Sequence, residues 1–247
     1  MKSKKLFATT FCVVLIASAR AHGACSNATL EGNYGFTITG VNSSLTLAAT
    51  VGQITADGKG GLSGVQTTSD DGVIASNVTA SGSYAIKSNC TGTASITPNG
   101  GSASNYAIIV DSAGKQIEMV EIDKGFTESG YALAQGKATC SLAGIKGAYG
   151  LHGGGFDSST VPYSFADLIK SDGAGNLTGT ETGSVGGTIF STKLASTYTV
   201  DANCTGTTSP KGNGSGHTYF VIVDGGNSAF QIQTDSGLIV TSVVEKN

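Results

Sequence analysis

The sequence predicts an all-β chain of two tandem antiparallel up-and-down β-barrels with about eight strands each. Three observations lead to this fold: one pattern occurs twice, short apolar runs alternate with turn signals, and no stretch after the first residues has a helical period. Gly supplies 37 of the 247 residues and Pro only 3, which is typical of strands joined by tight turns. Two β-sandwiches remain the alternative, because they give the same sequence signals.

The repeat is carried by two motifs. The segment 25–35, CSNATLEGNYG, returns at 140–150 as CSLAGIKGAYG, and 89–93, NCTGT, returns at 203–207 unchanged. The offsets between equivalent cysteines are 140 − 25 = 115 and 204 − 90 = 114 residues. A register held to one residue over a whole unit indicates two copies of one small fold. We expect the first copy at 22–137 and the second at 138–247.

Within the first copy, Tyr34, Phe36 and Ile38 alternate with smaller or polar residues, which is the period of a half-buried strand. Segments such as Asp57-Gly58 and Pro98-Asn99-Gly100 separate the apolar runs. They predict tight turns, because Gly and Asn accept a positive φ easily. We expect strands, two of the shorter ones joining into one, at 34–39, 47–56, 61–68, 73–80, 83–87, 92–97, 106–111 and 116–122, with a closing piece at 130–135.

The second copy follows the same order. Its segment 172–179, DGAGNLTG, matches 57–64, and 219–224, YFVIVD, matches 106–111, YAIIVD. Tyrosines recur at the matched positions, and recurrence in both copies favours packing over a role that one copy alone performs. Some could still line a mouth and stack a sugar ring, although Trp, the best stacking platform, is absent. The candidate barrel-lining residues are Tyr34, Tyr84, Tyr106, Tyr149, Tyr198 and Tyr219.

The first residues predict a secretory signal peptide at 1–21. Lys2, Lys4 and Lys5 precede the apolar run 6–18, and Ala19-Arg20-Ala21 is a suitable cleavage site. The apolar run is too short to span a bilayer comfortably. We therefore expect an exported protein, periplasmic or extracellular, with no membrane span. A lipoprotein cut before Cys25 is the alternative.

The net negative charge of the mature chain disfavours anionic partners. The signal holds four basic residues, so the mature chain keeps 14 − 4 = 10 against 17 acidic ones and contains no arginine. Arginine is the preferred residue for phosphate and nucleic-acid recognition. An acidic surface without it disfavours nucleic acid and anionic lipid as partners.

Cys12 belongs to the signal, so four cysteines remain, and an oxidising compartment favours pairing them. Four cysteines allow three connectivities. Each copy should be self-contained, so we expect Cys25–Cys90 and Cys140–Cys204. In an up-and-down barrel, strands one and five start at the same end, so the short tail before strand one can cross the barrel base to Cys90.

A resemblance to known barrels accompanies these motifs. The segment 140–144, CSLAG, the Gly-x-Tyr at 147–149 and the hairpin 172–180, DGAGNLTGT, resemble the opening of avidin-type barrels in the wider calycin group. This resemblance implies an eight-stranded barrel with a ligand mouth. Avidin-type sites are walled by tryptophans, which this chain lacks, so no ligand residue is transferred. The chain also resembles uncharacterised exported bacterial proteins with this same repeat, which implies no particular activity.

Catalytic patterns are weak. Neither a Gly-x-Ser-x-Gly nor a His-Glu-x-x-His motif occurs. His152 and His217 lack counterparts in the first copy, and a hydrolase or isomerase built on either is the least favoured hypothesis. Glu118 and Glu121, near Asp123, should face opposite sides of one strand, so we expect a solvated acidic face instead of a glycosidase pair. No catalytic, metal or cofactor residue is assigned.

The function that these observations favour is binding without catalysis. An eight-stranded barrel is wide enough either to be filled by its own side chains or to hold one small ligand. We expect a small apolar or amphipathic molecule inside a barrel, or an envelope or extracellular protein on one face. The alternative is a structural or surface-interaction protein with filled barrels. The sequence does not predict the oligomeric state.

Overall fold

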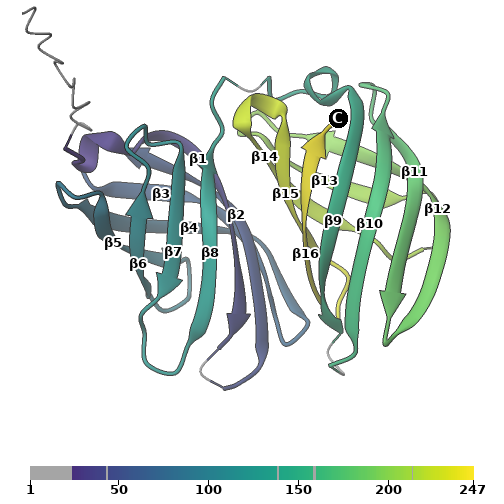
Figure 1. The fold of residues 1–247 in the computed structure, drawn as a ribbon, viewed down its shortest axis with the longest axis horizontal. Helices are drawn as coiled ribbons and strands as arrows, with labels where there is room; N and C mark the ends of the chain where they lie inside the picture. Colours follow the sequence, from purple (N-terminus) through teal and green to yellow (C-terminus); the bar gives the residue numbers. More distant parts are fainter. Residues whose placement is uncertain (1–23, 43, 138, 158–159, 213) are drawn as a thin grey trace, which may run out of the picture.

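The computed structural model describes residues 24–42, 44–137, 139–157, 160–212 and 214–247. The expected signal peptide, with Cys12, lies outside the described residues. The described chain forms two closed barrels of eight antiparallel strands each, standing side by side (Figure 1). The predicted fold class is therefore confirmed, and the sandwich alternative is wrong.

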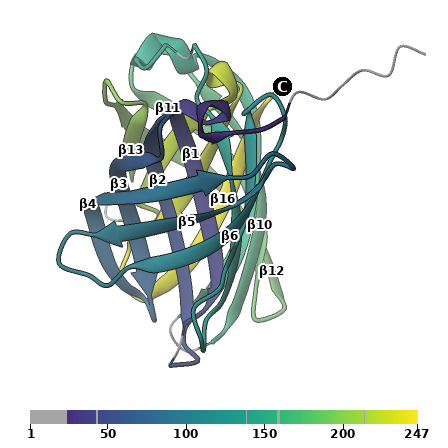
Figure 2. The same cartoon turned by 90° about the vertical axis from the view of Figure 1, so that its left-hand side faces the viewer.

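In each barrel, every strand pairs with its neighbours in sequence, and the last strand pairs with the first. Figure 2 shows β4, β5 and β6 forming the wall of the first barrel that faces away from the second. The expected strands 73–80 and 83–87 are one long strand, β4. The first barrel contains β1 (Glu31–Val41), β2 (Leu47–Asp57), β3 (Gly61–Asp70), β4 (Val73–Ile86), β5 (Thr91–Pro98), β6 (Ser104–Val110), β7 (Gln116–Glu121) and β8 (Thr127–Ala134).

The second barrel repeats this order. Its strands are β9 (Gly147–Asp157), β10 (Pro162–Ser171), β11 (Asn176–Val185), β12 (Thr188–Val200), β13 (Thr205–Pro210), β14 (Thr218–Val223), β15 (Ser228–Gln233) and β16 (Leu238–Lys246). The described helices are short 3₁₀ turns: η1 (Asn27–Thr29), η2 (Leu142–Ile145) and η3 (Asp224–Gly226). None of the described helices is long and apolar enough to cross a membrane.

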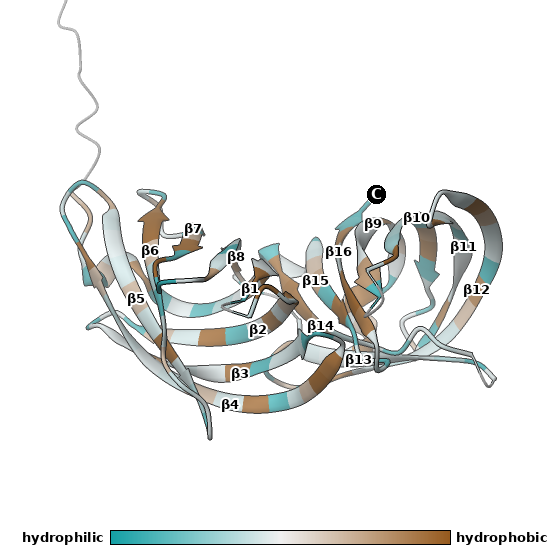
Figure 3. Ribbon diagram, turned by 90° about the horizontal axis from the view of Figure 1, so that it is seen from below, coloured by the Kyte–Doolittle hydropathy of each residue, from teal (hydrophilic) through white to brown (hydrophobic). Residues whose placement is uncertain are grey.

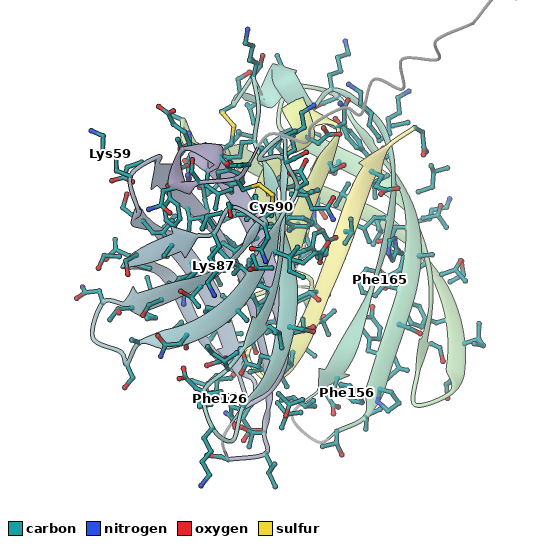
Figure 4. All side chains as sticks on the ribbon, turned by 60° about the vertical axis from the view of Figure 1, so that its left-hand side comes forward. Lys59, Lys87, Cys90, Phe126, Phe156 and Phe165 are labelled. Carbon is teal, nitrogen blue, oxygen red and sulfur yellow. A yellow bond between two sulfur atoms is a disulfide. The ribbon has the colours of Figure 1, made fainter. Side chains whose placement is uncertain are left out.

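One disulfide closes the same end of each barrel. The bridges are Cys25–Cys90 and Cys140–Cys204, as predicted, and Figure 4 shows Cys90 at that end with Phe126 at the other. The tail before β1 reaches the turn after β4, where the Cys25 N–H donates to the Ser88 carbonyl oxygen at 3.2 Å. Two disulfides suit a protein that folds in an oxidising environment.

The first barrel has one continuous apolar cluster in its interior, built on large residues such as Phe36 and Tyr106 with alanines packed between them. Tyr34, Phe36 and Ile38 of β1 all lie inside, as their alternation predicts. Interior residues of the second barrel form two smaller clusters, one around Tyr149 and Ile169 and one around Tyr198 and Phe220. The second barrel is therefore less completely filled than the first.

The two barrels share a buried apolar interface. Outward residues of β2 and β8 meet outward residues of β14, β15 and β16, and Figure 3 shows the hydrophobic segments of these strands where the barrels meet. The Tyr131 and Phe230 rings meet edge to face, with centroids 5.0 Å apart. An added Cβ on Gly35 would lie 2.5 Å from a Val223 methyl carbon, so only glycine permits this approach. The interface cluster is Ala49, Val51, Tyr219, Val221, Val223, Phe230, Ile232 and Ile239.

Polar groups at the edges of the interface are also paired. The buried Gln135 side chain donates to the carbonyl oxygens of Ile222 at 3.0 Å and Asn203 at 3.2 Å. The backbone carbonyl oxygen of Gln135 accepts from the Gly225 N–H at 3.0 Å. The Ser69 hydroxyl donates to the Leu238 carbonyl oxygen at 2.6 Å. Buried polar groups that are hydrogen-bonded avoid the cost of desolvation, so both ends of the interface are fixed.

A one-residue shift in β14 creates this interface. The Val110 N–H donates to the Cys90 carbonyl oxygen, and the Ile222 N–H donates to the Cys204 carbonyl oxygen, both at 2.9 Å. The structural counterpart of Val110 is therefore Ile222, and the sequence match that pairs Val110 with Val223 is wrong by one residue. Because side chains alternate across a strand, that shift moves every side chain to the opposite face. Tyr219 consequently lies between the barrels, whereas Tyr106 lies inside the first one.

Replacing either cysteine pair with alanine should destabilise the chain by a similar amount. The bridges close loops of 65 and 64 residues, and in the chain-entropy estimate each contributes about 4 kcal/mol. We expect urea unfolding of Cys25→Ala/Cys90→Ala and Cys140→Ala/Cys204→Ala to show comparable losses of the free energy of unfolding. A loss below about 1 kcal/mol for either pair would contradict a structural role for that bridge.

Val221→Ala should destabilise the chain by about 2 kcal/mol, because it removes buried methyl groups and leaves a cavity. Val221 is 0 % exposed, whereas Ile109, its structural counterpart in the first barrel, is 59 % exposed. We expect Ile109→Ala, the matched control, to change the free energy of unfolding by less than about 0.5 kcal/mol. Urea unfolding measures both, and equal effects would show that the interface does not stabilise the pair of barrels.

Candidate ligand-binding site

The second barrel encloses a cavity of about 640 Å³. Residues of β10, β11 and β12 line it, and it extends to the turns opposite the disulfide end, where Asp157, Val161 and Gly216 form its border. The corresponding cavity of the first barrel measures only about 170 Å³. Ligand pockets typically have volumes of about 300–1,000 Å³, so the second barrel has room for a small molecule and the first does not.

Exchanges at paired positions explain the difference. In the first barrel, Phe36 of β1 lies opposite Gly52 of β2, and an added Cβ on Gly52 would lie 2.5 Å from the Phe36 ring. The equivalent pair in the second barrel is Leu151 and Asp167. The interior is thus filled by an aromatic ring in one copy and lined by a shorter aliphatic chain and a carboxyl group in the other.

Three aromatic rings form one wall of the cavity. The Tyr163 and Phe165 ring centroids are 5.1 Å apart, and Tyr163 and Phe190 are parallel within 1° with centroids 6.1 Å apart. Phe165 is accommodated because its strand neighbour is Gly153, where an added Cβ would lie 2.7 Å from the ring. Figure 4 labels Phe165 in the second barrel. The wall therefore presents aromatic surface to any molecule inside.

Two carboxyl groups face the same cavity. Asp167 of β10 is the direct cross-strand partner of Glu181 of β11, and both line the cavity. The Tyr163 hydroxyl donates a short hydrogen bond to Glu181 Oε1, which orients that carboxylate. Asp167 Oδ1 is enclosed and has no hydrogen-bond partner among the described residues. The site thus combines aromatic surface with two acidic groups on neighbouring strands.

Burial, followed by the nearby Glu181 charge, raises the pKa of Asp167 to about 7 from an ordinary value of 3.8. Burial disfavours the charged form of a carboxyl group, and a like charge close by disfavours it further. Burial also raises the pKa of Tyr163 well above its ordinary value, with the Glu181 hydrogen bond as the next cause. The Asp167 carboxyl is therefore a group that can gain or lose a proton near neutral pH.

Polar groups border the opposite wall. The Ser242 hydroxyl donates to Gln231 Oε1 at 3.1 Å, and both residues line the cavity. Gln233 Oε1 is buried without a hydrogen-bond partner among the described residues. These groups give the interior a polar side across from the aromatic wall, so the cavity suits a molecule that is partly apolar and partly polar.

The six tyrosines predicted from the repeat lie elsewhere. Tyr84 and Tyr198 donate to backbone carbonyl oxygens near the disulfide end, at 2.7 Å to Leu30 and 3.0 Å to Leu142, and Tyr34 donates to Gly114 at 2.8 Å.

Tyr106 lies in the interior cluster of the first barrel. Tyr149 lies beside a void of about 50 Å³ in the second barrel, and Tyr219 lies between the barrels. None of the six lines the large cavity.

The histidines lie outside the cavity interior. His152 is exposed on the outer face of β9. His217 is exposed near the cavity border, and its Nδ1 lies 2.7 Å from Asp235 Oδ1. Asp235 also accepts the backbone N–H groups of Gly216 and His217. This pair therefore joins the loop before β14 to the turn after β15.

The acidic face predicted in the first barrel requires a correction. Glu118 is exposed and Asp123 accepts hydrogen bonds from Asn105, but Glu121 is 6 % exposed and points inward. Burial, followed by the Glu128 charge, raises the pKa of Glu121 to about 7. The expectation of a solvated face is wrong for Glu121, because inward residues of β7 alternate with Glu118 and Val120. Each barrel thus places carboxyl groups inside, but the cavity beside them measures about 170 Å³ in the first barrel and about 640 Å³ in the second.

The site residues of the second barrel were not identified from sequence, although a signal exists. Tyr163, Phe165, Asp167 and Ile169 occupy alternate positions of one strand, so an acidic residue stands in an otherwise apolar inward series. No group of three or more His, Cys, Asp or Glu side chains that could hold a metal ion occurs among the described residues.

Comparisons with known proteins add the following. No protein-family model matches the chain, and no curated protein matches its sequence. Among solved structures, a protein of unknown function from the DUF3598 family of Nostoc punctiforme is 12 % identical, with a TM-score of 0.28, covering 89 % of this chain and 97 % of that one. Kievitone hydratase from Nectria haematococca is 10 % identical, with a TM-score of 0.26, covering 92 % and 94 %.

The free energy of unfolding of the wild type, relative to Asp167→Asn, should fall as the pH rises from 4 to 7. The pKa of Asp167 is raised to about 7 in the folded chain, so the folded state binds more protons than the unfolded state in this window. The stability that this group contributes is therefore fully present below its ordinary pKa of 3.8 and is lost as the pH rises through about 7. Urea unfolding at a series of pH values measures the difference.

Asp172→Asn is the matched control. The Asn176 side chain, followed by the Asn176 and Ala174 backbone N–H groups, holds the pKa of Asp172 at about 2. The difference in the free energy of unfolding between the wild type and Asp172→Asn should therefore stay constant between pH 5 and 7. A constant difference between the wild type and Asp167→Asn over the same range would contradict the protonation of Asp167 near neutral pH.

Proposed function

We propose that this chain is an exported, non-enzymatic binding protein whose second barrel holds one small amphipathic molecule. The observation that carries the proposal is the cavity of about 640 Å³ in the second barrel, which has an aromatic wall, two carboxyl groups and a polar far side. The signal peptide at 1–21 and the two repeats at 22–137 and 138–247 belong to the same proposal.

The first barrel has a supporting role in this proposal. Its interior is filled by the cluster around Phe36, and its outer face covers the outer face of β14, β15 and β16. It therefore holds one side of the ligand-binding barrel in place. This division assigns the structural alternative to the first copy and the binding role to the second.

Native mass spectrometry of the mature protein from its own exported fraction is the direct experiment. We expect a copurified mass that disappears on denaturation, because an amphipathic molecule would remain in the cavity. For the purified empty protein, we expect saturable binding of N-phenyl-1-naphthylamine, a neutral apolar probe whose fluorescence increases in apolar surroundings. Absence of both a copurified mass and probe binding would overturn the proposal.

Ser196→Trp should weaken probe binding tenfold or more, because Ser196 lines the cavity and an indole ring would fill the space. Thr197→Trp is the matched control, since Thr197 is the next residue of β12 and is exposed on the outer face. We expect the control to bind the probe like the wild type. Circular dichroism of both variants shows that the barrel is intact, and equal binding by both would place the probe outside the second barrel.

A further inference from the structure

We propose that the cavity of the second barrel binds an organic ammonium ion: a primary or secondary amine carried on an aromatic or aliphatic body. This inference rests on the proposed function, because it names the chemical class of the ligand. Its basis is the juxtaposition of Asp167 and Glu181 with the rings of Tyr163 and Phe190 inside an otherwise open cavity.

The carboxyl groups lack a cation of their own. Neither Asp167 nor Glu181 takes part in an ion pair among the described residues. The two lysines that border the cavity are Lys193, which is exposed, and Lys211, whose Nζ donates to Asn176 Oδ1 at 2.9 Å. Lining residues of the cavity also include Asp157. The inner part of the cavity is therefore acidic and the bordering lysines lie toward solvent.

A bound ammonium ion would remove an unfavourable interaction. Residues directly opposite on neighbouring antiparallel strands have Cβ atoms about 4.5–5.5 Å apart, and like charges at that distance repel. In the empty protein a proton relieves the repulsion, since the pKa of Asp167 is raised. An ammonium group supplies both the positive charge and two or three N–H donors, and Asp167 Oδ1 is free to accept one of them.

The aromatic wall fits the same ligand. Cations are attracted to the face of an aromatic ring, and the parallel Tyr163 and Phe190 rings lie within the same lining as both carboxyl groups. Tyr163 connects the two features, because its hydroxyl donates to Glu181. An ammonium group near Glu181 would therefore lie close to the Tyr163 ring while its carbon body extends along Phe165.

The cavity is too large for an ion alone. A volume of about 640 Å³ suits a molecule of drug-like size, and Ca²⁺ prefers six to eight oxygen ligands, more than two carboxyl groups supply. A carboxylate or phosphate ligand would face the same negative charges and is disfavoured. Among small molecules, the acidic and aromatic lining thus favours cations over neutral molecules and neutral molecules over anions.

Isothermal titration calorimetry at pH 7.5 with three isosteric probes tests the inference on the mature chain. The probes are 2-(2-naphthyl)ethylamine, 2-(2-naphthyl)ethanol and the anion of 2-naphthaleneacetic acid, which share a naphthalene ring and differ in charge. We expect the amine to bind tenfold or more tightly than the alcohol and the acid to show no saturable binding. Equal affinities for the amine and the alcohol would overturn the inference.

Variants assign the preference to the two carboxyl groups. In Asp167→Asn/Glu181→Gln, both side chains keep their size and lose their charge, so we expect the amine to bind no more tightly than the alcohol while the alcohol retains its affinity. The matched control is Glu121→Gln/Glu128→Gln, which removes two carboxyl groups inside the first barrel and should leave the amine affinity within twofold of the wild type. Retained amine preference in the first variant would overturn the inference.

Three further outcomes separate this inference from the proposed function. Binding of N-phenyl-1-naphthylamine without any preference for the amine would overturn the ammonium assignment and leave a ligand-holding barrel. Absence of binding by every probe would overturn both. Saturable Ca²⁺ binding that is lost in Asp167→Asn/Glu181→Gln, together with no amine binding, would assign the carboxyl groups to a metal instead.

Discussion

The alternation of side chains across a closed antiparallel sheet is the constraint on which this structure depends. In a barrel, each strand residue points either into the interior or outward, and a shift of one residue exchanges the two sets. In β14 that exchange places Tyr219, Val221 and Val223 outside the second barrel and Phe220 and Ile222 inside it. The outward set forms the contact with the first barrel. A change of register in one strand thus converts a self-contained repeat into half of a two-barrel unit.

The two copies keep the same disulfide end and differ at the other end. At the disulfide end, both cysteines in the turn before the fifth strand have a positive φ, 66° at Cys90 and 64° at Cys204. Tyr84 and Tyr198 both donate to the carbonyl oxygen of the first residue of the short helix, Asn27 in one copy and Leu142 in the other. The opposite end holds Phe36 beside Gly52 in one copy and Leu151 beside Asp167 in the other. Conserved closure at one end allows the other end to vary without loss of the fold.

Much of the fold was predictable from sequence, because its determinants are local or repeated. Asp57, for example, accepts backbone N–H groups from Lys59, Gly60 and Gly61, and such aspartate-glycine turns are readable as hairpins. The cysteine pairing followed from the repeat. Tyr219 was misplaced because the matched letters suggested an unchanged register, whereas the structural register is fixed by hydrogen bonds at Cys204. That information is not present in the matched segment.

The site was less predictable than the fold, because a cavity forms where the side chains of several strands together do not fill the barrel interior. Gly153 in place of Ile38 and Leu151 in place of Phe36 are small changes in sequence, and their effect depends on which residues face them. Asp167 was the one readable signal, as an acidic residue in an inward series. Its partner Glu181 becomes apparent only when β10 and β11 are paired in register. Burial of that pair therefore follows from topology, not from either residue alone.

The position of the site within the two-barrel unit bears on how a ligand would enter. The aromatic and acidic residues lie on β10, β11 and β12, whereas the contact with the first barrel uses β14, β15 and β16 (Figure 1). The covered wall is fixed by buried apolar packing and by the hydrogen bonds of Gln135 and Ser69. The opposite wall has exposed outer residues such as Leu168 and Ile189. Local opening requires the least free energy where few buried contacts are lost, so the wall that carries the site is the one best able to move when a ligand enters.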